Sequence, residues 1–290
     1  MNNSKEGSDL KTVLVTGANS GMGLATSVEL AKRGYYVIMA CRDDVRGQKA
    51  IEEARRQSGS NHLELRKLDL ASLESISNFA VQFRYSFNQL DVLINNAGLL
   101  AVKRTVTNDG FESMMGVNHL GHFLLTNLLL EPLRAAEQGR IVTVSSSAHK
   151  AGTIYFEDPH LIQKYSIVKG YAQSKLANIL FTLEISERLN GSNVTANCLD
   201  PGPVSTNIGI SRSNRLWGEL FHALMKPFVS SSLKGAQTAI YLATSPEVVG
   251  VTGQYFHKQR ISKPSEAARD KRLASRLWEW SEREVGLITK

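Results

Sequence analysis

Tyr171 and Lys175 stand four positions apart at the start of an apolar run that extends to Leu189. An α-helix repeats every 3.6 residues, so side chains at this spacing project from one helix face. A free tyrosine titrates near pH 10, and a close ammonium stabilises the phenolate and lowers that pKa. A fall of two to three units needs only about 3 to 4 kcal/mol of differential interaction. The pair is a candidate proton donor with its own cation, although this spacing also arises by chance.

Three glycines, Gly17, Gly21 and Gly23, follow a short β-rich run at residues 12–15 and precede an amphipathic segment. A strand, a glycine loop and a helix bring backbone N–H groups and the positive end of the helix to a phosphate. Glycine permits the tight turn and the close approach of a pyrophosphate. The segment therefore predicts nucleotide binding, although its Gly-x-x-x-Gly-x-Gly spacing differs from the commoner Gly-x-Gly-x-x-Gly.

Arg42 follows the second predicted strand, residues 36–40, where a dinucleotide fold meets the adenosine ribose. An acidic residue there would bond a free 2'-hydroxyl, whereas an arginine pairs with a 2'-phosphate, so Arg42 favours NADP(H) over NAD(H). The alternative is that Asp43 caps the next helix and Arg42 points to solvent. Asp69, after the third predicted strand, either reaches the adenine amino group or caps a helix that begins near Ser72.

Two further polar groups follow predicted strands. Residues 95–98, Asn-Asn-Ala-Gly, come directly after the strand 91–94, and small and amide side chains there suit a ligand crevice as well as a plain turn. The serines 145–147 end the strand 140–145. A serine hydroxyl beside the tyrosine could hold a carbonyl oxygen, though serine triplets are also common in loops.

Asn118 lies in a long helix that the apolar pattern predicts over residues 111–133. A buried amide is costly unless it is bonded, so we expect Asn118 to have a partner, which could be purely structural. His119 and His122 share this helix. We interpret them as surface or satisfied core histidines and predict no metal site, because no carboxylate or cysteine cluster accompanies them.

Strands alternate with helices along the chain, which predicts an α/β fold of the single-domain Rossmann type. We expect a doubly wound parallel sheet of about seven strands with helices on both faces and the ligand at the carboxyl strand ends. A polar tail spans 1–10 and the catalytic domain 11–290. Residues 205–230 are apolar without clear periodicity, and they predict either a cover over the substrate or a helix that closes the core. The last strand is expected at 252–256 and a charged terminal helix at 264–285.

Composition narrows the class of protein. The chain has 290 residues, 42% hydrophobic and 21% charged, as in ordinary globular proteins. Its net charge of +7 is spread along the sequence without a run of five basic residues, which argues against a nucleic-acid partner. The two cysteines suit buried thiols in a reducing compartment, and we find no signal segment or membrane span. The expected location is cytoplasmic.

These motifs together resemble the short-chain dehydrogenase/reductase family, over nearly the whole chain. The matching positions are Thr16-Gly17-x-x-x-Gly21-x-Gly23, Asn95-Asn96-Ala97-Gly98, Asn118, Ser146, Tyr171-x-x-x-Lys175 and Pro201-Gly202. Several details resemble the retinol dehydrogenase-like branch: Ala40-Cys41-Arg42-Asp43, the run 118–123, the run 174–178, the ending 277–279, and the 25-residue separation of Ser146 from Tyr171. The chain departs from membrane-bound members of that branch because it shows no apolar N-terminal anchor.

The resemblance implies a nicotinamide-dependent oxidoreductase in which Tyr171 is the general acid/base. Lys175 would lower the pKa of Tyr171 and hold the nicotinamide ribose, Ser146 would bond the substrate oxygen, and Asn118 would order a relay water. The family pattern selects Ser146 over its two neighbours. The expected cofactor-binding residues are Gly17, Asn19, Ser20, Gly21, Met22, Gly23, Arg42, Asp69, Leu70, Asn95, Ala97, Gly98, Tyr171, Lys175, Pro201, Gly202, Val204 and Thr206.

The resulting hypothesis is an NADP-preferring reductase or dehydrogenase that acts on a small apolar carbonyl or alcohol. Family resemblance also implies a homodimer or homotetramer. One rival is a regulatory protein that senses NADP(H) without turnover, but such a protein would not need the four polar residues assigned to catalysis. Another is sugar-nucleotide epimerase or dehydratase chemistry, which uses a similar Tyr/Lys pair. About 90 residues follow the sixth predicted strand, which leaves little room for the larger substrate domain of those enzymes.

Overall fold

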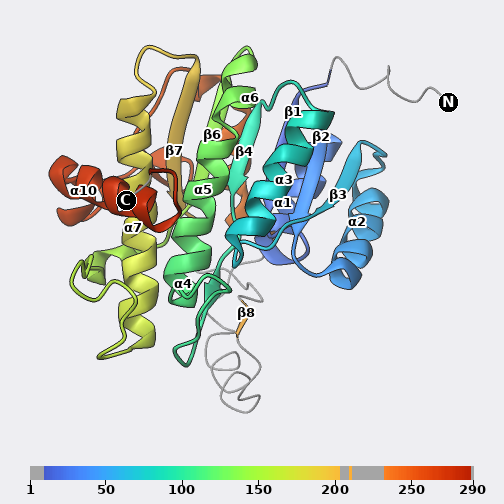
Figure 1. Ribbon diagram of the computed structural model, residues 1–290. Coiled ribbons are helices and arrows are strands. Elements are labelled where there is room, and N and C mark those ends of the chain that lie inside the picture. The colour runs from blue at the N-terminus through green and yellow to red at the C-terminus, as the bar shows by residue number, and fades with distance from the viewer. Residues whose placement is uncertain (1–9, 203–208, 211–231, 289–290) are drawn as a thin grey trace.

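The computed structural model describes residues 10–202, 209–210 and 232–288, and one twisted sheet runs through its centre (Figure 1). The strand order is β10-β9-β7-β6-β4-β1-β2-β3, with β5 and β8 paired separately. The strands are β1 (Thr12–Thr16), β2 (Tyr36–Cys41), β3 (Leu63–Lys67), β4 (Val92–Asn95), β5 (Leu99–Leu100), β6 (Gly139–Val144), β7 (Val194–Asp200), β8 (Gly209–Ile210), β9 (Tyr255–His257) and β10 (Arg260–Ile261). From β3 to β9 every neighbouring pair is parallel, which confirms the doubly wound Rossmann-type fold.

The expected count of about seven strands is wrong for the described part of the chain, where the main sheet has eight. The additional strand is β10, which pairs antiparallel with β9 at the sheet edge. It is two residues long and both are exposed, so neither length nor hydrophobic alternation marked it in the sequence. The separate pair of β5 and β8 is equally short.

The central strands alternate between two apolar layers. In β1, Val13 and Val15 belong to one buried cluster and Leu14 to the other. Likewise, Val92 in β4 faces one cluster and Leu93 the other, as the period of two along a strand requires. Both faces of the sheet are therefore covered, as in other parallel sheets.

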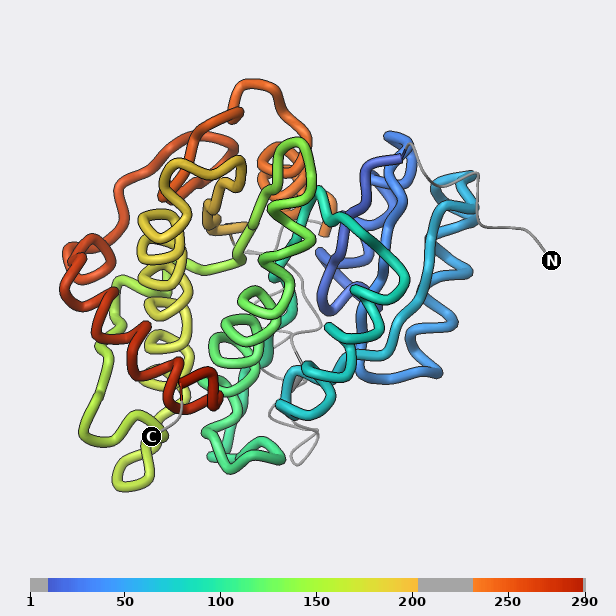
Figure 2. The backbone as a smooth tube through the Cα atoms, turned by 45° about the horizontal axis from the view of Figure 1, so that its top comes forward, coloured from blue at the N-terminus to red at the C-terminus, as the bar shows by residue number. Residues whose placement is uncertain are grey.

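Helices cover both faces of the sheet. The clusters place α1, α2 and α9 on one face, and α3, α5, α7 and α10 on the other, and Figures 1 and 2 both show α10 lying across α7. The helices are α1 (Gly21–Lys32), α2 (Asp44–Ser58), α3 (Leu73–Ser86), α4 (Ser113–Met115), α5 (Gly121–Leu128), α6 (Leu130–Ala135), α7 (Ile167–Arg188), α9 (Ser232–Thr244) and α10 (Lys271–Glu284), with a π-helix η1 (Gly116–Leu120) and 3-10 turns η2 (Ser147–Ala151), η4 (Pro246–Val248) and η5 (Ala267–Arg269).

The single helix expected over 111–133 is instead four consecutive pieces: α4, the π-helix η1, α5 and α6. Its apolar pattern persists through all four, because each piece packs on the same layer, so the pattern did not reveal the breaks. A π-helical turn shifts the backbone hydrogen bonds from i+4 to i+5, and such turns are frequent at functional sites. Asn118 lies at the middle of this turn.

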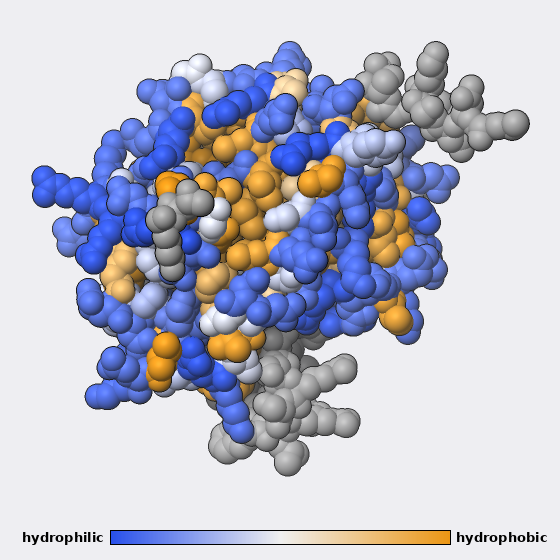
Figure 3. Space-filling view, viewed as in Figure 1, coloured by the Kyte–Doolittle hydropathy of each residue, from blue (hydrophilic) through white to orange (hydrophobic). Residues whose placement is uncertain are grey.

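The helix that carries Tyr171 begins four residues earlier than expected, at Ile167, so Tyr171 lies in its second turn. The terminal helix α10 starts at Lys271, after the 3-10 turn η5, and not at residue 264. Among the helices that the structure describes, none combines the length and apolarity needed to cross a membrane. In the space-filling view, apolar residues show between hydrophilic ones over the middle of the face formed by α5 and α7 (Figure 3).

Candidate functional site

A cavity of about 410 Å³ opens at the carboxyl ends of β1 and β4. The chain crosses from β3 to the other side of β1 at this point, which is where doubly wound sheets bind ligands. The sequence-predicted residues that line the cavity are Gly17, Asn19, Ser20, Gly21, Met22, Gly23, Arg42, Asp69, Leu70, Ala97, Gly98, Ser146, Tyr171, Lys175, Pro201 and Gly202. Asn95 and Asn118 are buried behind it. Val204 and Thr206 lie outside the described residues, as does the cover expected at 205–230 apart from β8.

The glycine loop leaves no room for side chains on two of its glycines. Gly17 has φ of +65°, and a Cβ there would lie 2.9 Å from the Cα of Ala97. A Cβ on Gly23 would collide with the carbonyl oxygen of Gly17. Ser20 precedes α1 without a side-chain cap bond, and the first turn has no acidic residue. The backbone N–H groups at this helix start thus face the cavity uncapped, which suits a dinucleotide pyrophosphate.

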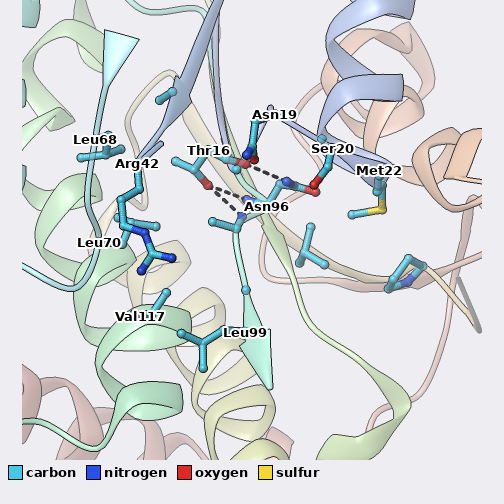
Figure 4. Close-up of a pocket in the computed structure, with 18 of the residues that line it drawn as sticks. Thr16, Asn19, Ser20, Met22, Arg42, Leu68, Leu70, Asn96, Leu99 and Val117 are labelled. Atoms are coloured by element: carbon cyan, nitrogen blue, oxygen red, sulfur yellow. Dashed lines mark hydrogen bonds between the residues drawn. The ribbon is translucent and has the colours of Figure 1, made fainter. Parts of the chain in front are cut away.

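Thr16, which the sequence prediction did not assign a role, holds the two strand ends together. Its hydroxyl accepts hydrogen bonds from the backbone N–H groups of Asn96 and Ala97, both at 2.9 Å (Figure 4). The amide of Asn96 donates in return to the carbonyl oxygen of Thr16 at 2.6 Å. The position of this threonine, at the end of an apolar strand and directly before a glycine, could have indicated its role. Threonine is common in strands, however, so the position alone did not single it out.

Arg42 and Asp43 line the cavity where it meets the end of β2. Figure 4 shows the Arg42 side chain reaching from the end of β2 into the space beside Leu70 and Val117. Within the described part of the chain, the Arg42 guanidinium forms no ion pair or hydrogen bond. Asp43 caps α2 by accepting a hydrogen bond from the backbone N–H of Arg46. The Arg42 side chain is exposed and also lines the cavity. The capping of α2 by Asp43 therefore does not exclude a binding role for Arg42.

The sequence left open whether Asp69 caps the helix α3, and the structure shows that it does not. The N-cap of α3 is Ser72, whose hydroxyl accepts from the backbone N–H of Ser75 at 3.2 Å. Asp69 instead accepts a hydrogen bond from the backbone N–H of Ala71 at 3.0 Å and lines the cavity. Its carboxylate is therefore not the cap of α3, and its contact with adenine stays a prediction.

Tyr171 and Lys175 both reach the cavity from α7. The Lys175 ammonium lies 5.7 Å from the centre of the Tyr171 ring and donates to the carbonyl oxygen of Val144 at 3.1 Å. Burial lowers the pKa of Lys175 to about 8. Burial also raises the pKa of Tyr171, against a hydrogen bond from Ser146 that lowers it. The chain alone thus does not give Tyr171 the lowered pKa that its spacing from Lys175 predicted.

The three consecutive serines at 145–147 lie in different surroundings. Ser145 is buried and donates to the carbonyl oxygen of Lys175 at 2.8 Å, so its hydroxyl is occupied within the fold. Ser146 lines the cavity and its side chain bonds Tyr171, while its oxygen also caps η2 through the N–H of Ala148. Ser147 is exposed outside the cavity lining. Of the three, Ser146 is the hydroxyl placed beside Tyr171.

Asn118 is fully buried, and its amide is bonded within the fold. The side-chain oxygen accepts from the backbone N–H of Leu99 at 2.8 Å, and the side-chain nitrogen donates to the Leu99 carbonyl and to Ser174. A Cβ on Gly98 would contact both the Asn118 side-chain oxygen and the Lys175 nitrogen, at 3.5 and 3.6 Å. Asn118 therefore fixes the loop of Gly98 and Leu99 beside the Lys175 ammonium. Asn95 has a similarly internal role, donating to Thr126.

Asp200 is a charged group near the site that the sequence prediction did not single out. It is 6% exposed at the end of β7, and its charge raises the pKa of both Tyr171 and Lys175. Its carboxylate accepts hydrogen bonds from the N–H of Gly202 at 2.9 Å and the hydroxyl of Tyr255 at 3.4 Å. An Asp-Pro-Gly run reads as a turn, which hid the electrostatic contribution of Asp200.

Comparisons with known proteins agree with this geometry. Residues 11–216 match the family model described as short chain dehydrogenase. Retinol dehydrogenase 14 of Homo sapiens is 47% identical, over 96% of this chain and 87% of that protein, and retinol dehydrogenase 13 of Homo sapiens is 45% identical, over 96% and 85%. A crystal structure of an uncharacterized protein from Mycobacterium paratuberculosis is 37% identical with a TM-score of 0.76, covering 97% of both chains. The chain belongs to the short-chain dehydrogenase family of oxidoreductases, with retinol dehydrogenases among its relatives.

Proposed function

We propose that this protein is an NADP(H)-dependent oxidoreductase that interconverts a carbonyl and an alcohol on an apolar substrate. The observation that supports this most directly is the convergence on one cavity of the glycine loop, Arg42, Ser146, Tyr171 and Lys175. A regulatory protein that only binds a dinucleotide would not need the hydrogen-bonded Ser146 and Tyr171 at the far end of that cavity. The family itself uses nicotinamide cofactors.

In this proposal the glycine loop and the start of α1 hold the pyrophosphate, and Lys175 holds the nicotinamide ribose. The bound cofactor supplies the hydride for reduction and accepts it in the reverse direction. Tyr171 gives its phenolic proton to the substrate oxygen as the carbonyl carbon gains hydride. Ser146 donates a hydrogen bond to the same oxygen, on which negative charge develops in the transition state.

Regeneration of the Tyr171 proton falls to Lys175 and a water ordered near Asn118. The closeness of the Asn118 oxygen and the Lys175 nitrogen to Gly98 supports this path. The raised pKa of Tyr171 favours its protonated form, which is the form that reduction requires. A positive nicotinamide ring close to the phenol would lower that pKa and favour proton acceptance in the oxidation direction.

Arg42 carries the preference for NADP(H) in this proposal, because its guanidinium is unpaired among the described residues and reaches the adenosine end of the cavity. Relatives named retinol dehydrogenases make a long apolar aldehyde or alcohol the preferred substrate class. A cytoplasmic location suits the two free, buried cysteines. We also propose that the chain assembles into a homodimer or homotetramer. Light scattering on the purified protein measures its molar mass and so tests this assembly.

The test is a panel of aldehydes and ketones, retinaldehyde included, followed by NADPH absorbance with NADH in parallel. We expect the wild type to turn over with NADPH. A Tyr171→Phe variant should bind NADPH as the wild type does but show no turnover. An Arg42→Ala variant should use NADPH roughly 10- to 100-fold less efficiently, with its use of NADH unchanged, because it loses a charged hydrogen bond. Substantial turnover by Tyr171→Phe would refute the acid role. A tenfold preference of wild type for NADH would refute the role of Arg42.

A further inference from the structure

His122 is a buried histidine that connects the cofactor loop to Asn118. It is the second residue of α5, directly after the π-helix η1, and is 1% exposed. Its Nε2 is 2.9 Å from the hydroxyl oxygen of Thr16, and its Nδ1 is 3.1 Å from the backbone carbonyl oxygen of Asn118. The first contact is to the residue that fixes Asn96 and Ala97, and the second is to the residue beside Lys175.

The hydrogen-bond partners allow His122 only one neutral tautomer. A backbone carbonyl can only accept, so Nδ1 of His122 must carry the proton that it donates to Asn118. Nε2 of the neutral ring is then an acceptor, and the Thr16 hydroxyl must donate to it. Thr16 is free to do so because its oxygen already accepts two backbone N–H groups and keeps its own proton to give.

The environment keeps this ring neutral. Burial, together with the charge of Lys175, lowers the pKa of His122 to about 4, against the hydrogen bond to Asn118, which raises it. A protonated ring would present a second N–H to Thr16, which would then have to donate its own proton to the carbonyl of Ile94 at 3.4 Å. The arrangement of Thr16, His122 and Asn118 is thus a fixed, one-directional chain of hydrogen bonds at neutral pH.

We propose that His122 is a positioning residue for the reaction, its Nδ1–H tautomer linking the Thr16 hydroxyl of the cofactor loop to the Asn118 carbonyl beside Lys175. The link keeps the pyrophosphate loop and the lysine end of the site in register although they lie on different elements, β1 and η1. This inference rests on the proposed function, since it assigns His122 to the geometry of that reaction. His122 itself does not line the cavity; it contacts the lining through Thr16 and does not touch the reacting atoms.

Two amide substitutions separate the two halves of the link. In His122→Asn the side-chain amide occupies the place of Nδ1 and can still donate to the Asn118 carbonyl, but it does not reach Thr16. In His122→Gln the amide occupies the place of Nε2 and can still accept from Thr16, but the side-chain hydrogen bond to the Asn118 carbonyl is lost. A residue with a merely structural role would respond to both changes through stability alone.

We expect His122→Asn to weaken NADPH binding roughly two- to tenfold with kcat nearly unchanged, and His122→Gln to lower kcat by a similar factor with NADPH affinity nearly unchanged, as loss of one hydrogen bond implies. NADPH affinity is read by fluorescence titration and needs no turnover. The matched control is His119→Gln, since His119 is equally buried one turn away but bonds Ser281 on α10.

Equal losses of affinity and kcat in both His122 variants would overturn the inference, as would losses no different from those of His119→Gln. The opposite split, with affinity lost in His122→Gln and kcat in His122→Asn, would also overturn it. If wild type binds NADPH but reduces nothing in the panel, the proposed function fails. The comparison of NADPH affinity between the two variants still decides the role of His122 in that case.

Discussion

Replacing Lys175 by methionine should make the protein more stable while abolishing its turnover. Lys175 is 3% exposed, and burial lowers its pKa from 10.5 to about 8. At about 1.4 kcal/mol for each pKa unit, the folded state bears a cost of about 3 kcal/mol for holding the ammonium there. The Val144 carbonyl would keep a partner after the substitution, because Asn178 also donates to it at 3.0 Å. Lys175→Met is thus expected to gain about 2 to 3 kcal/mol of unfolding free energy at pH 7.

The contribution of Lys175 to the unfolding free energy should change with pH. The folded pKa of Lys175 is below the unfolded value, so between about 8 and 10.5 the unfolded chain holds a proton that the folded chain has released. The contribution of Lys175 to stability therefore improves as pH rises through this window, and its cost is fully present below about pH 8. At about pH 9.5, about 2 kcal/mol of the cost should be gone, so the advantage of Lys175→Met should shrink.

The measurement is urea unfolding followed by tryptophan fluorescence, for wild type and variant at both pH values. Lys169→Met is the matched control, since Lys169 lies on the same helix with an exposed side chain and should change stability by no more than about 0.5 kcal/mol. If Lys175→Met is no more stable than wild type at pH 7, the buried ammonium does not carry the cost assigned to it. A gain that is the same at both pH values would refute the electrostatic origin.

Two other substitutions test the surroundings of the site. Asp200→Asn removes a charge that raises the pKa of Tyr171, so the pH profile of alcohol oxidation should move to lower pH, and a shift to higher pH would contradict this. Gly17→Ala and Gly34→Ala both place alanine at positive φ, but only the first would crowd a neighbour, Ala97, at 2.9 Å. NADPH affinity should fall in Gly17→Ala and hold in Gly34→Ala, and equal effects would show that backbone strain alone explains the loss.

The sheet and the place of the glycine loop were predictable because they depend on patterns local in sequence. The continuous apolar run of Val13, Leu14 and Val15 marks a strand that is buried on both faces, and parallel strands share one carboxyl edge. The glycines after β1 and Gly98 after β4 therefore had to meet there once the strand order was assumed. The same reasoning could not identify β10, which is short and exposed.

The electrostatics of the site could not be predicted from spacing. Tyr171 and Lys175 share a helix face as expected, yet burial determines the direction in which each pKa moves. Burial depends on the whole fold, and Asp200 enters the site from a strand 25 residues beyond Lys175. The break at η1 was hidden for a related reason, since the hydrophobic pattern reports which face is buried and not which backbone groups bond.

The packing of α10 on α7 has a consequence for the order in which the site is built during synthesis. Trp278 stacks on Phe181 with ring centres 5.9 Å apart, and Arg188 lies 4.4 Å above the Trp278 ring, so the back of the helix that carries Tyr171 is covered by the end of the chain. The N-terminal residues of a chain leave the ribosome first. The strands and helix of the glycine loop can therefore form early, whereas α7 gains its outer packing only when the last residues emerge. On a nascent chain, the glycine loop is therefore complete before the helix that carries Tyr171 and Lys175 receives its outer cover.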